Sequence, residues 1–205
     1  MKTLRTLAFA LATCSITQTV AASPVTVSFE PVAQTVNVND LVVVNLVVSG
    51  LAPGVSIGSF DLFLYFDPAI IGALLVDFGP YLGNPTSLEA LTGFDISSTP
   101  GQAEVFEDSL LSPAALTMLQ DPVRAAGFTL ATLTFIAGAP GISELSFGLT
   151  IGADAYGAPL NLSGGVGSIN VLDSTPVPEP GTFILLAITF LPGAALLRRF
   201  GKAIR

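Results

Sequence analysis

Hydrophobic and polar residues alternate with a period of two through the central part of the chain. Val25, Val27 and Phe29 fall on one face of a short segment, and turn residues bound the apolar run 41–48 on both sides. Turns rich in glycine and proline separate these runs from the ones that follow. This alternation is typical of β-strands with one buried face. Many short strands between turns predict an all-β fold, a β-sandwich.

The segment 59–68, SFDLFLYFDP, has two faces of different chemistry. The first is apolar and consists of Phe60, Leu62, Leu64 and Phe66. The second combines aromatic rings with carboxylates and consists of Asp61, Phe63, Tyr65 and Asp67. Aromatic rings beside carboxylates can stack on sugars or anchor a protein partner, so we take this second face as the candidate ligand face. The alternative is a strand covered on both faces, and the absence of tryptophan weakens the sugar interpretation.

Two segments depart from simple alternation. In 128–137, Phe128 and Leu130 share one face, whereas Leu133 and Phe135 fall on the other. Either both faces of this strand are buried or a bulge shifts its phase.

The segment 112–121 has the pattern of a helix rather than a strand. Ser112 followed by Pro113 forms a suitable N-cap and first helical residue. We therefore expect one short helix in an otherwise all-β domain.

Charge is segregated along the chain, which has a formal net charge of −8. All fifteen carboxylates lie between Glu30 and Glu179, and the only basic residue in that region is Arg124. An acidic surface repels the phosphate backbone, so no nucleic-acid partner is expected.

The residue inventory excludes several chemistries. The chain has no histidine, and its single cysteine is Cys14. This excludes histidine-based triads, thiol catalysis within the domain, and zinc sites built on histidine or cysteine. Paired carboxylates could hydrolyse glycosides, and the candidates are Asp61, Asp67, Glu104, Glu107 and Asp108. Because carboxylates at strand ends are usually only solvated, we predict no catalytic residues and no enzyme.

We predict no cofactor and no metal ligands. The alternative is calcium, for which oxygen ligands are sufficient. The chain contains no Asp-x-Asp-x-Asp-Gly loop.

Residues 1–22 predict a secretory signal peptide. Lys2 and Arg5 precede the apolar run 7–12, and small residues at 20–22 suit cleavage after Ala22. Two alternatives are a buried first helix and lipidation at Cys14, whose context LATC approaches a lipoprotein box.

The C-terminal region divides into three parts. A linker, 174–181, carries Pro178, Glu179 and Pro180; an uncharged segment, 182–197, follows; and a basic tail, 198–205, begins with Arg198 and Arg199. Sixteen helical residues span roughly 24 Å, less than a hydrocarbon core of about 30 Å. The basic tail would stay in the cytoplasm by the positive-inside rule. We expect temporary residence in the inner membrane, and the alternative is a buried C-terminal helix of the domain.

This C-terminal region resembles the PEP-CTERM sorting signal of Gram-negative bacteria. The matching features are the motif at 178–180, the apolar stretch 183–197 and the two arginines at 198–199. The resemblance implies that an exosortase removes the tail and that the body reaches the cell surface or the extracellular matrix.

The region 23–173 resembles a cohesin domain, a nine-stranded jelly-roll sandwich akin to carbohydrate-binding modules. The best matches are Phe60 and Asp61, YFDP at 65–68, and the stretches 127–135 and 169–171. The chain departs from the family at Asn39, where glycine is frequent, and in a long loop before Phe60. The resemblance implies a non-enzymatic protein that binds or scaffolds a protein partner, and the alternative is a carbohydrate-binding module that holds exopolysaccharide.

Overall fold

A computed structural model of the chain describes residues 24–173. Its strands are β1 Val25–Glu30, β2 Ala33–Asn37, β3 Leu41–Ser49, β4 Ile57–Tyr65, β5 Ile71–Phe78, β6 Ala90–Asp95, β7 Gln102–Ser109, β8 Phe128–Ala137, β9 Gly141–Asp154, β10 Leu162–Gly164 and β11 Val166–Leu172. The helical segments are η1 Pro85–Ser87 and α1 Pro113–Gln120. The signal peptide predicted for 1–22, the linker at 174–181, the apolar segment 182–197 and the basic tail 198–205 lie outside the described residues. Within the described range, no helix is both long and apolar enough to cross a membrane.

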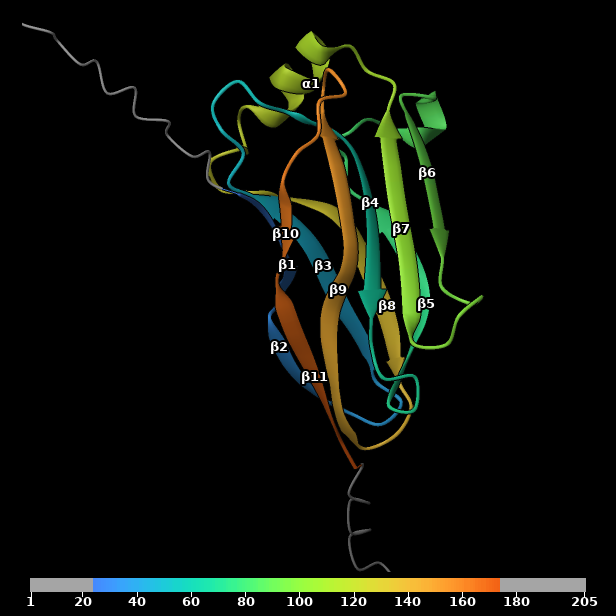
Figure 1. The fold of residues 1–205 in the computed structure, drawn as a ribbon. Helices are drawn as coiled ribbons and strands as arrows, with labels where there is room; N and C mark the ends of the chain where they lie inside the picture. The colour runs from blue at the N-terminus through green and yellow to red at the C-terminus, as the bar shows by residue number, and fades with distance from the viewer. Residues whose placement is uncertain (1–23, 174–205) are drawn as a thin grey trace, which may run out of the picture.

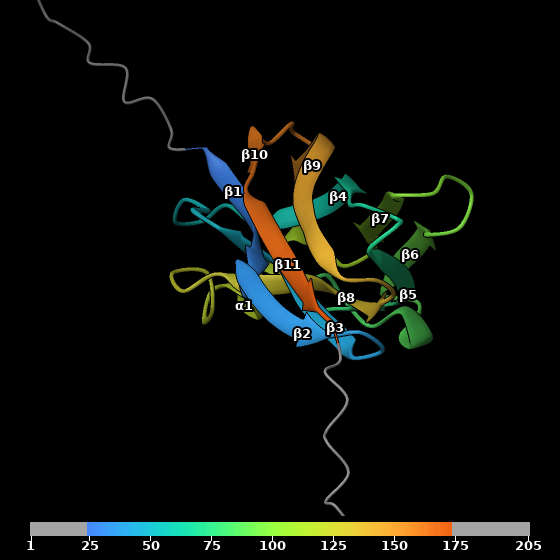
Figure 2. The same ribbon diagram turned by 90° about the horizontal axis from the view of Figure 1, so that it is seen from below.

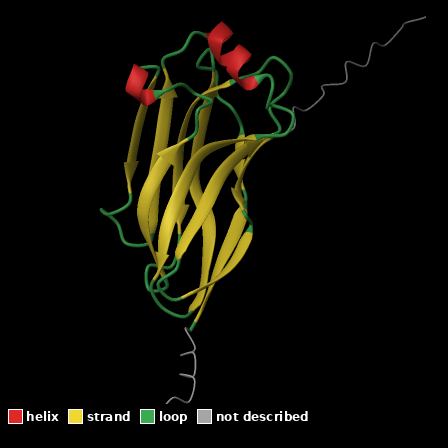
Figure 3. Ribbon diagram, turned by 180° about the vertical axis from the view of Figure 1, so that it is seen from behind, coloured by secondary structure: helices red, strands yellow, loops and turns green. Residues whose placement is uncertain are grey.

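The strands form two sheets packed face to face (Figures 1 and 2). Sheet A has the order β10-β1-β3-β8-β5, and sheet B has the order β2-β11-β9-β4-β7-β6. The helical segments lie at one end of the sandwich (Figure 3). The predicted all-β sandwich is therefore confirmed.

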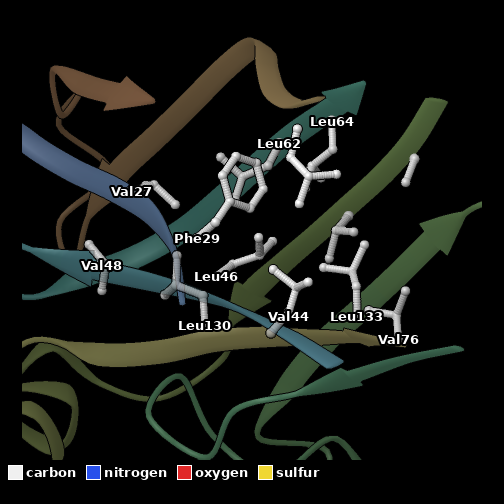
Figure 4. Close-up of a cluster of buried hydrophobic side chains, with 14 of the residues drawn as sticks. Val27, Phe29, Val44, Leu46, Val48, Leu62, Leu64, Val76, Leu130 and Leu133 are labelled. Carbon is white, nitrogen blue, oxygen red and sulfur yellow. The ribbon is translucent and has the colours of Figure 1, made fainter. Parts of the chain in front are cut away.

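The hydrophobic core lies between the two sheets and follows the alternation of the sequence (Figure 4). Val27 and Phe29 on β1 face Leu62 and Leu64 on β4, and all four side chains are buried. Burying one such side chain contributes about 1.5–3 kcal/mol. The apolar face predicted for β4 is thus confirmed, and it fixes which side chains of the strand point outward.

A bulge resolves the irregular phase of β8. Leu46 on β3 pairs with Ala131 and Val47 pairs with Thr129, which leaves Leu130 without a partner across the ladder. Leu130 and Ala131 are consecutive and both are buried. The extra residue shifts the side-chain phase by one, so that Leu133 and Phe135 also face the core. Of the two alternatives for this strand, the bulge is confirmed.

The first and last segments of the chain run in parallel and cross between the sheets together. β1 pairs with β10 in sheet A, and β2 pairs with β11 in sheet B. Pro31 has no N–H and interrupts the ladder between β1 and β2. At the same level the N–H of Gly165 donates to the Val27 carbonyl (2.8 Å), and the N–H of Ser168 donates to the Val32 carbonyl (2.9 Å). Splitting each terminal segment between two sheets explains why the structure has eleven strands where the resemblance implied nine.

The predicted helix forms α1 and is anchored by one buried polar side chain. The Ser112 side chain accepts a hydrogen bond from the Ala115 N–H, as expected of an N-cap, and Pro113 is the first helical residue. At the other end, Gln120 is fully buried. Its amide nitrogen donates to the carbonyls of Ile57 (2.8 Å) and Tyr81 (3.0 Å), and its oxygen accepts from the Ile57 N–H (2.9 Å).

Gln120→Leu should lower the free energy of unfolding by about 2–4 kcal/mol, because it leaves buried backbone groups of Ile57 and Tyr81 without partners. Met118→Leu, on the exposed side of the same helix, should change it by less than about 0.5 kcal/mol. Urea unfolding of both variants measures the difference. Equal stabilities would contradict the anchoring role of Gln120.

Candidate functional site

The candidate site is the outer face of sheet B. Residues of β4 that alternate with its buried ones point away from the core, and these include Asp61, Phe63 and Tyr65. Side chains at paired positions of antiparallel strands project from the same face, so the ladder registers show which residues join them. The register arranges the outward side chains in rows across the sheet.

Asp61 lies in a row between two apolar side chains. It pairs with Phe106 on β7 and with Ile151 on β9. Phe106 in turn pairs with Gly93 on β6, and a Cβ atom at Gly93 would overlap the Phe106 ring. The ring therefore lies across the glycine, in space that only glycine leaves free.

The two aromatic residues of β4, Phe63 and Tyr65, each belong to a further row. Phe63 pairs with Glu104, which pairs with Asp95 on the edge strand β6. Tyr65 pairs with Gln102 on one side and with Ser146 on the other. A side chain at Gly148 would overlap the Tyr65 ring, so this ring also lies against a glycine of β9.

These outward side chains form what we call the sheet B face. Its apolar members are Phe63, Tyr65, Leu91, Phe106 and Ile151, and its acidic members are Asp61, Asp95, Glu104 and Asp108. Four of the apolar side chains are 37–53% exposed: Tyr65, Leu91, Phe106 and Ile151. The face thus presents apolar groups to solvent among carboxylates on a regular sheet.

Asp67 does not join this group, which corrects the predicted four-residue face. β4 ends at Tyr65, and the chain turns at Asp67-Pro68. The Asp67 N–H donates to the Ser143 hydroxyl (2.9 Å), and its carboxylate accepts from the Ala69 N–H (2.9 Å). Its carboxylate therefore caps a turn beyond the strand.

The sequence interpretation missed Leu91, Phe106 and Ile151. Phe106 had a local signal, because alternation within 103–108 places it on one face with Glu104 and Asp108. Leu91 and Ile151 had none, since their position beside β4 and β7 depends on the register of strands distant in sequence.

Two carboxylates of the sheet B face have shifted pKa values, for different reasons. Burial between its neighbours raises the pKa of Asp61, and the nearby charge of Asp108 raises it further. One carboxylate oxygen of Asp61, Oδ1, is shielded from solvent and accepts no hydrogen bond. By contrast, hydrogen bonds from the Ser98 hydroxyl and from the N–H groups of Ser97 and Ser98 lower the pKa of the exposed Asp95 to about 2.

Among the carboxylates that were candidates for glycoside hydrolysis, the structure separates Glu104 from Glu107. Glu104 points outward from β7, whereas Glu107 has the opposite phase and is completely buried. The two groups lie on opposite faces of one strand and cannot flank a single glycosidic bond. Within residues 24–173, no three acidic, histidine or cysteine side chains are grouped as metal ligands.

Glu107 is a buried carboxyl group without a partner. Neither of its oxygens accepts or donates a hydrogen bond, and its neighbours across the ladders, Phe60 and Thr92, are uncharged. Burial alone raises its pKa to about 8. The protonated, neutral form is therefore the form that the folded protein favours at neutral pH.

The comparisons with known proteins agree with the fold. No family model and no curated protein sequence matches the chain. Among solved structures, the sixth cohesin of Acetivibrio cellulolyticus scaffoldin B, in complex with a mutant Cel5 dockerin, has a TM-score of 0.57 and 18% identity. The match covers 73% of this chain and 100% of that one.

Two further matches are of the same kind. A type I cohesin–dockerin complex of Clostridium thermocellum, Coh-OlpC with Doc435, has a TM-score of 0.57 and 18% identity, covering 75% of this chain and 97% of that one. The cohesin module of a Clostridium perfringens family 33 glycoside hydrolase has a TM-score of 0.55 and 10% identity, covering 74% and 98%. These similarities show that residues 24–173 have the jelly-roll fold of cohesin modules, as the sequence resemblance implied.

We expect Glu107 to make stability fall as the pH rises. The folded protein retains the Glu107 proton up to about pH 8, whereas the unfolded chain releases it near the ordinary value of 4.5. Between these values the folded state binds more protons, so raising the pH favours unfolding. Glu107→Gln should therefore stabilise the protein by on the order of 2 kcal/mol near pH 8, with little effect near pH 5.

The measurement is urea unfolding at a series of pH values. Glu104→Gln, on the exposed face of the same strand, provides the matched control and, because it retains Glu107, should still lose stability as the pH rises towards 8. A parallel pH dependence in the original chain and in Glu107→Gln would refute the assignment.

Proposed function

We propose that this protein is an exported, non-enzymatic module that binds a protein partner through the sheet B face. The observation that carries the proposal is the set of half-exposed apolar side chains on that face, Tyr65, Leu91, Phe106 and Ile151, surrounded by carboxylates. Apolar centres with polar surroundings are typical of protein interfaces, and aromatic side chains are frequent among their energetically dominant residues.

The structural neighbours support a protein partner. Two of the similar structures are complexes of a cohesin with a dockerin, so in those proteins a module of this fold binds another protein. At 18% identity the likeness extends to the fold alone. The contact residues proposed for this chain therefore rest on its own surface.

Polysaccharide binding is the second candidate function. Phe63 and Tyr65 lie two residues apart on one strand, and the Tyr65 ring lies against Gly148. Aromatic rings on the outer face of a sheet can stack on sugar rings. Such a module would hold exopolysaccharide instead of a protein.

We further propose that the chain is exported through its signal peptide at 1–22 and sorted by its PEP-CTERM region. In this proposal Pro178, Glu179 and Pro180 are recognised by an exosortase, while Arg198 and Arg199 hold the tail on the cytoplasmic side of the inner membrane. The body is then released to the cell surface or matrix. Within the described residues, the buried core side chains belong to 25–171, and losing the tail would remove none of these.

The docking proposal predicts that substitutions on the sheet B face abolish partner binding. The exported chain, cross-linked in its host and identified by mass spectrometry, should yield one dominant protein partner. Phe63→Ala combined with Tyr65→Ala should reduce its capture about tenfold or more, as loss of central aromatic anchors does. Val43→Ala, an exposed apolar position on the outer face of sheet A, is the matched control.

Calorimetry with a panel of soluble glycans separates the two candidate functions. Glycan binding that disappears in the Phe63→Ala, Tyr65→Ala variant supports the polysaccharide function and displaces the protein-docking one. Undiminished capture of the protein partner by this variant would refute the docking face.

The sorting proposal predicts a shortened mature chain. Mass spectrometry of the surface-located protein should find a C-terminus near 178–181 and an N-terminus after Ala22. Replacing Pro178, Glu179 and Pro180 with alanine should leave the tail attached. A mature surface protein that still ends at Arg205 would exclude processing.

A further inference from the structure

We propose that the outer face of sheet A is a docking surface for the chain's own uncharged segment, 182–197, when that segment is outside a membrane. This surface is distinct from the sheet B face, because the two sheets turn their outer faces to opposite sides of the sandwich. Three features select the occupant: the side chains on the surface, the place where the chain leaves the domain, and the order of uncharged and basic residues after it.

The outer face of sheet A carries an apolar band beside the start of β3. Leu41 pairs with Ile136 in one row, and in the next row Thr134 pairs with Val43 on one side and Leu75 on the other. The apolar band consists of Leu41, Val43, Leu75 and Ile136. The first three are 47–62% exposed. The helical segments of the described range lie at the far end of the sandwich (Figures 1 and 3) and leave the band uncovered, as is typical of an interaction surface.

The next row on the same face is polar and has a carboxylate at each end. This acidic row consists of Glu30, Asn45, Thr132 and Asp77, in that order across the sheet. The Thr132 hydroxyl donates to the Asn45 side-chain oxygen (2.8 Å), so the two side chains point to the same side. Glu30 and Asp77 are exposed, and neither forms an ion pair within residues 24–173. An occupant that crosses the apolar band and then the acidic row must therefore be apolar first and basic afterwards.

The chain leaves the domain at the end of the sandwich where the apolar band lies. The Val38 N–H donates to the Leu172 carbonyl (3.1 Å), and β3 begins shortly afterwards at Leu41. Residues 173–181 can span at most about 30 Å, which is enough to pass around this end to the outer face of sheet A. The N-terminal side of the domain is less suitable, because β1 begins beside Ser49, at the far end of β3.

The residues after 181 have the order that this face requires. Segment 182–197 carries no charge, and it is followed by four basic residues: Arg198, Arg199, Lys202 and Arg205. As a helix the segment would span about 24 Å, whereas the apolar band and the acidic row together occupy about 14 Å along β3. The segment is therefore long enough to cover the band and to bring the basic residues to the acidic row. Docking would remove apolar surface from water and place opposite charges together.

A second copy of the chain is a poorer match to this face. Two such faces in contact would bring two acidic rows into one interface. The described part of each copy has one basic residue, Arg124, which already forms an ion pair with Asp121. Like charges in one interface without compensating cations oppose association.

The test uses the full chain in detergent-free buffer, with the photoreactive residue p-benzoylphenylalanine in place of Val43. After irradiation and proteolysis, mass spectrometry should find position 43 cross-linked to segment 182–197. A mixture of isotopically labelled and unlabelled chains should show that each cross-link lies within one molecule. The matched control carries the photoreactive residue in place of Ile151, which is similarly exposed on the sheet B face, and should give no cross-link to 182–197.

Leu75→Gln is the decisive variant, because it makes the apolar band polar at an exposed position. It should lower the yield of the cross-link from position 43 about fivefold, whereas Ile151→Gln on the opposite face should leave the yield unchanged. Glu30→Gln combined with Asp77→Asn should lower it about two- to fivefold at low salt and less at high salt. A yield that Leu75→Gln does not change would refute the docking surface.

Adding phosphatidylcholine vesicles separates this proposal from the sorting proposal. If segment 182–197 enters the bilayer, the cross-link seen in buffer should disappear as vesicles are added. A cross-link that is absent in buffer overturns the docking surface and leaves the sorting proposal standing. A cross-link that is present in buffer and persists with vesicles upholds the docking surface and counts against residence in the membrane. Cross-links from position 43 to residues 1–22, or between two copies, would show a different occupant and overturn the proposal.

Discussion

The parallel pairing of the first and last segments is the constraint on which the rest of the sandwich depends. β1 lies beside β10 in sheet A, and β2 lies beside β11 in sheet B, so each sheet contains both a beginning and an end of the domain. Parallel neighbours cannot be joined by a tight turn. The intervening strands must therefore leave and return, and they extend each sheet from one side of its terminal pair. The bonds from Gly165 to Val27 and from Ser168 to Val32 fix the level at which both segments change sheets.

The core also determines the composition of the sheet B face, because β4 contributes to both. Leu62 and Leu64 are buried, and Asp61, Phe63 and Tyr65 are the alternate residues. A slip of one residue would place carboxylate and phenol groups in the core. The free energy that stabilises the core therefore also holds the outward residues in register. Their spacing is fixed by the strands of sheet B, so no loop has to become ordered to form this face.

Alternation within one strand predicted which of its residues share a face. It could not predict features that depend on how two strands pair. Alternation within β4 correctly placed Asp61, Phe63 and Tyr65 together, whereas Asp67 was placed wrongly because the pattern does not show where the strand ends. Phe106 and Ile151 are the neighbours of Asp61 across the ladders. Both pairings depend on the register between strands that are more than forty residues apart in sequence. For the same reason, alternation alone could not decide between a bulge in β8 and burial of both its faces. The bulge at Leu130 is defined by the pairing of β8 with β3. The end regions, 1–22 and 174–205, stay predictions from sequence.

The parallel terminal strands also determine how the domain would carry a mechanical load. The described chain begins at one end of the sandwich and finishes at the other (Figure 1). Tension between Val25 and Leu172 would act along the strands, so the hydrogen bonds of the β1–β10 and β2–β11 ladders would be sheared together instead of opening one by one. Resistance to such a pull is a property of the unfolding rate and not of equilibrium stability. A module pulled by both ends of its chain would therefore keep its fold, and with it the sheet B face, for a time set by that rate.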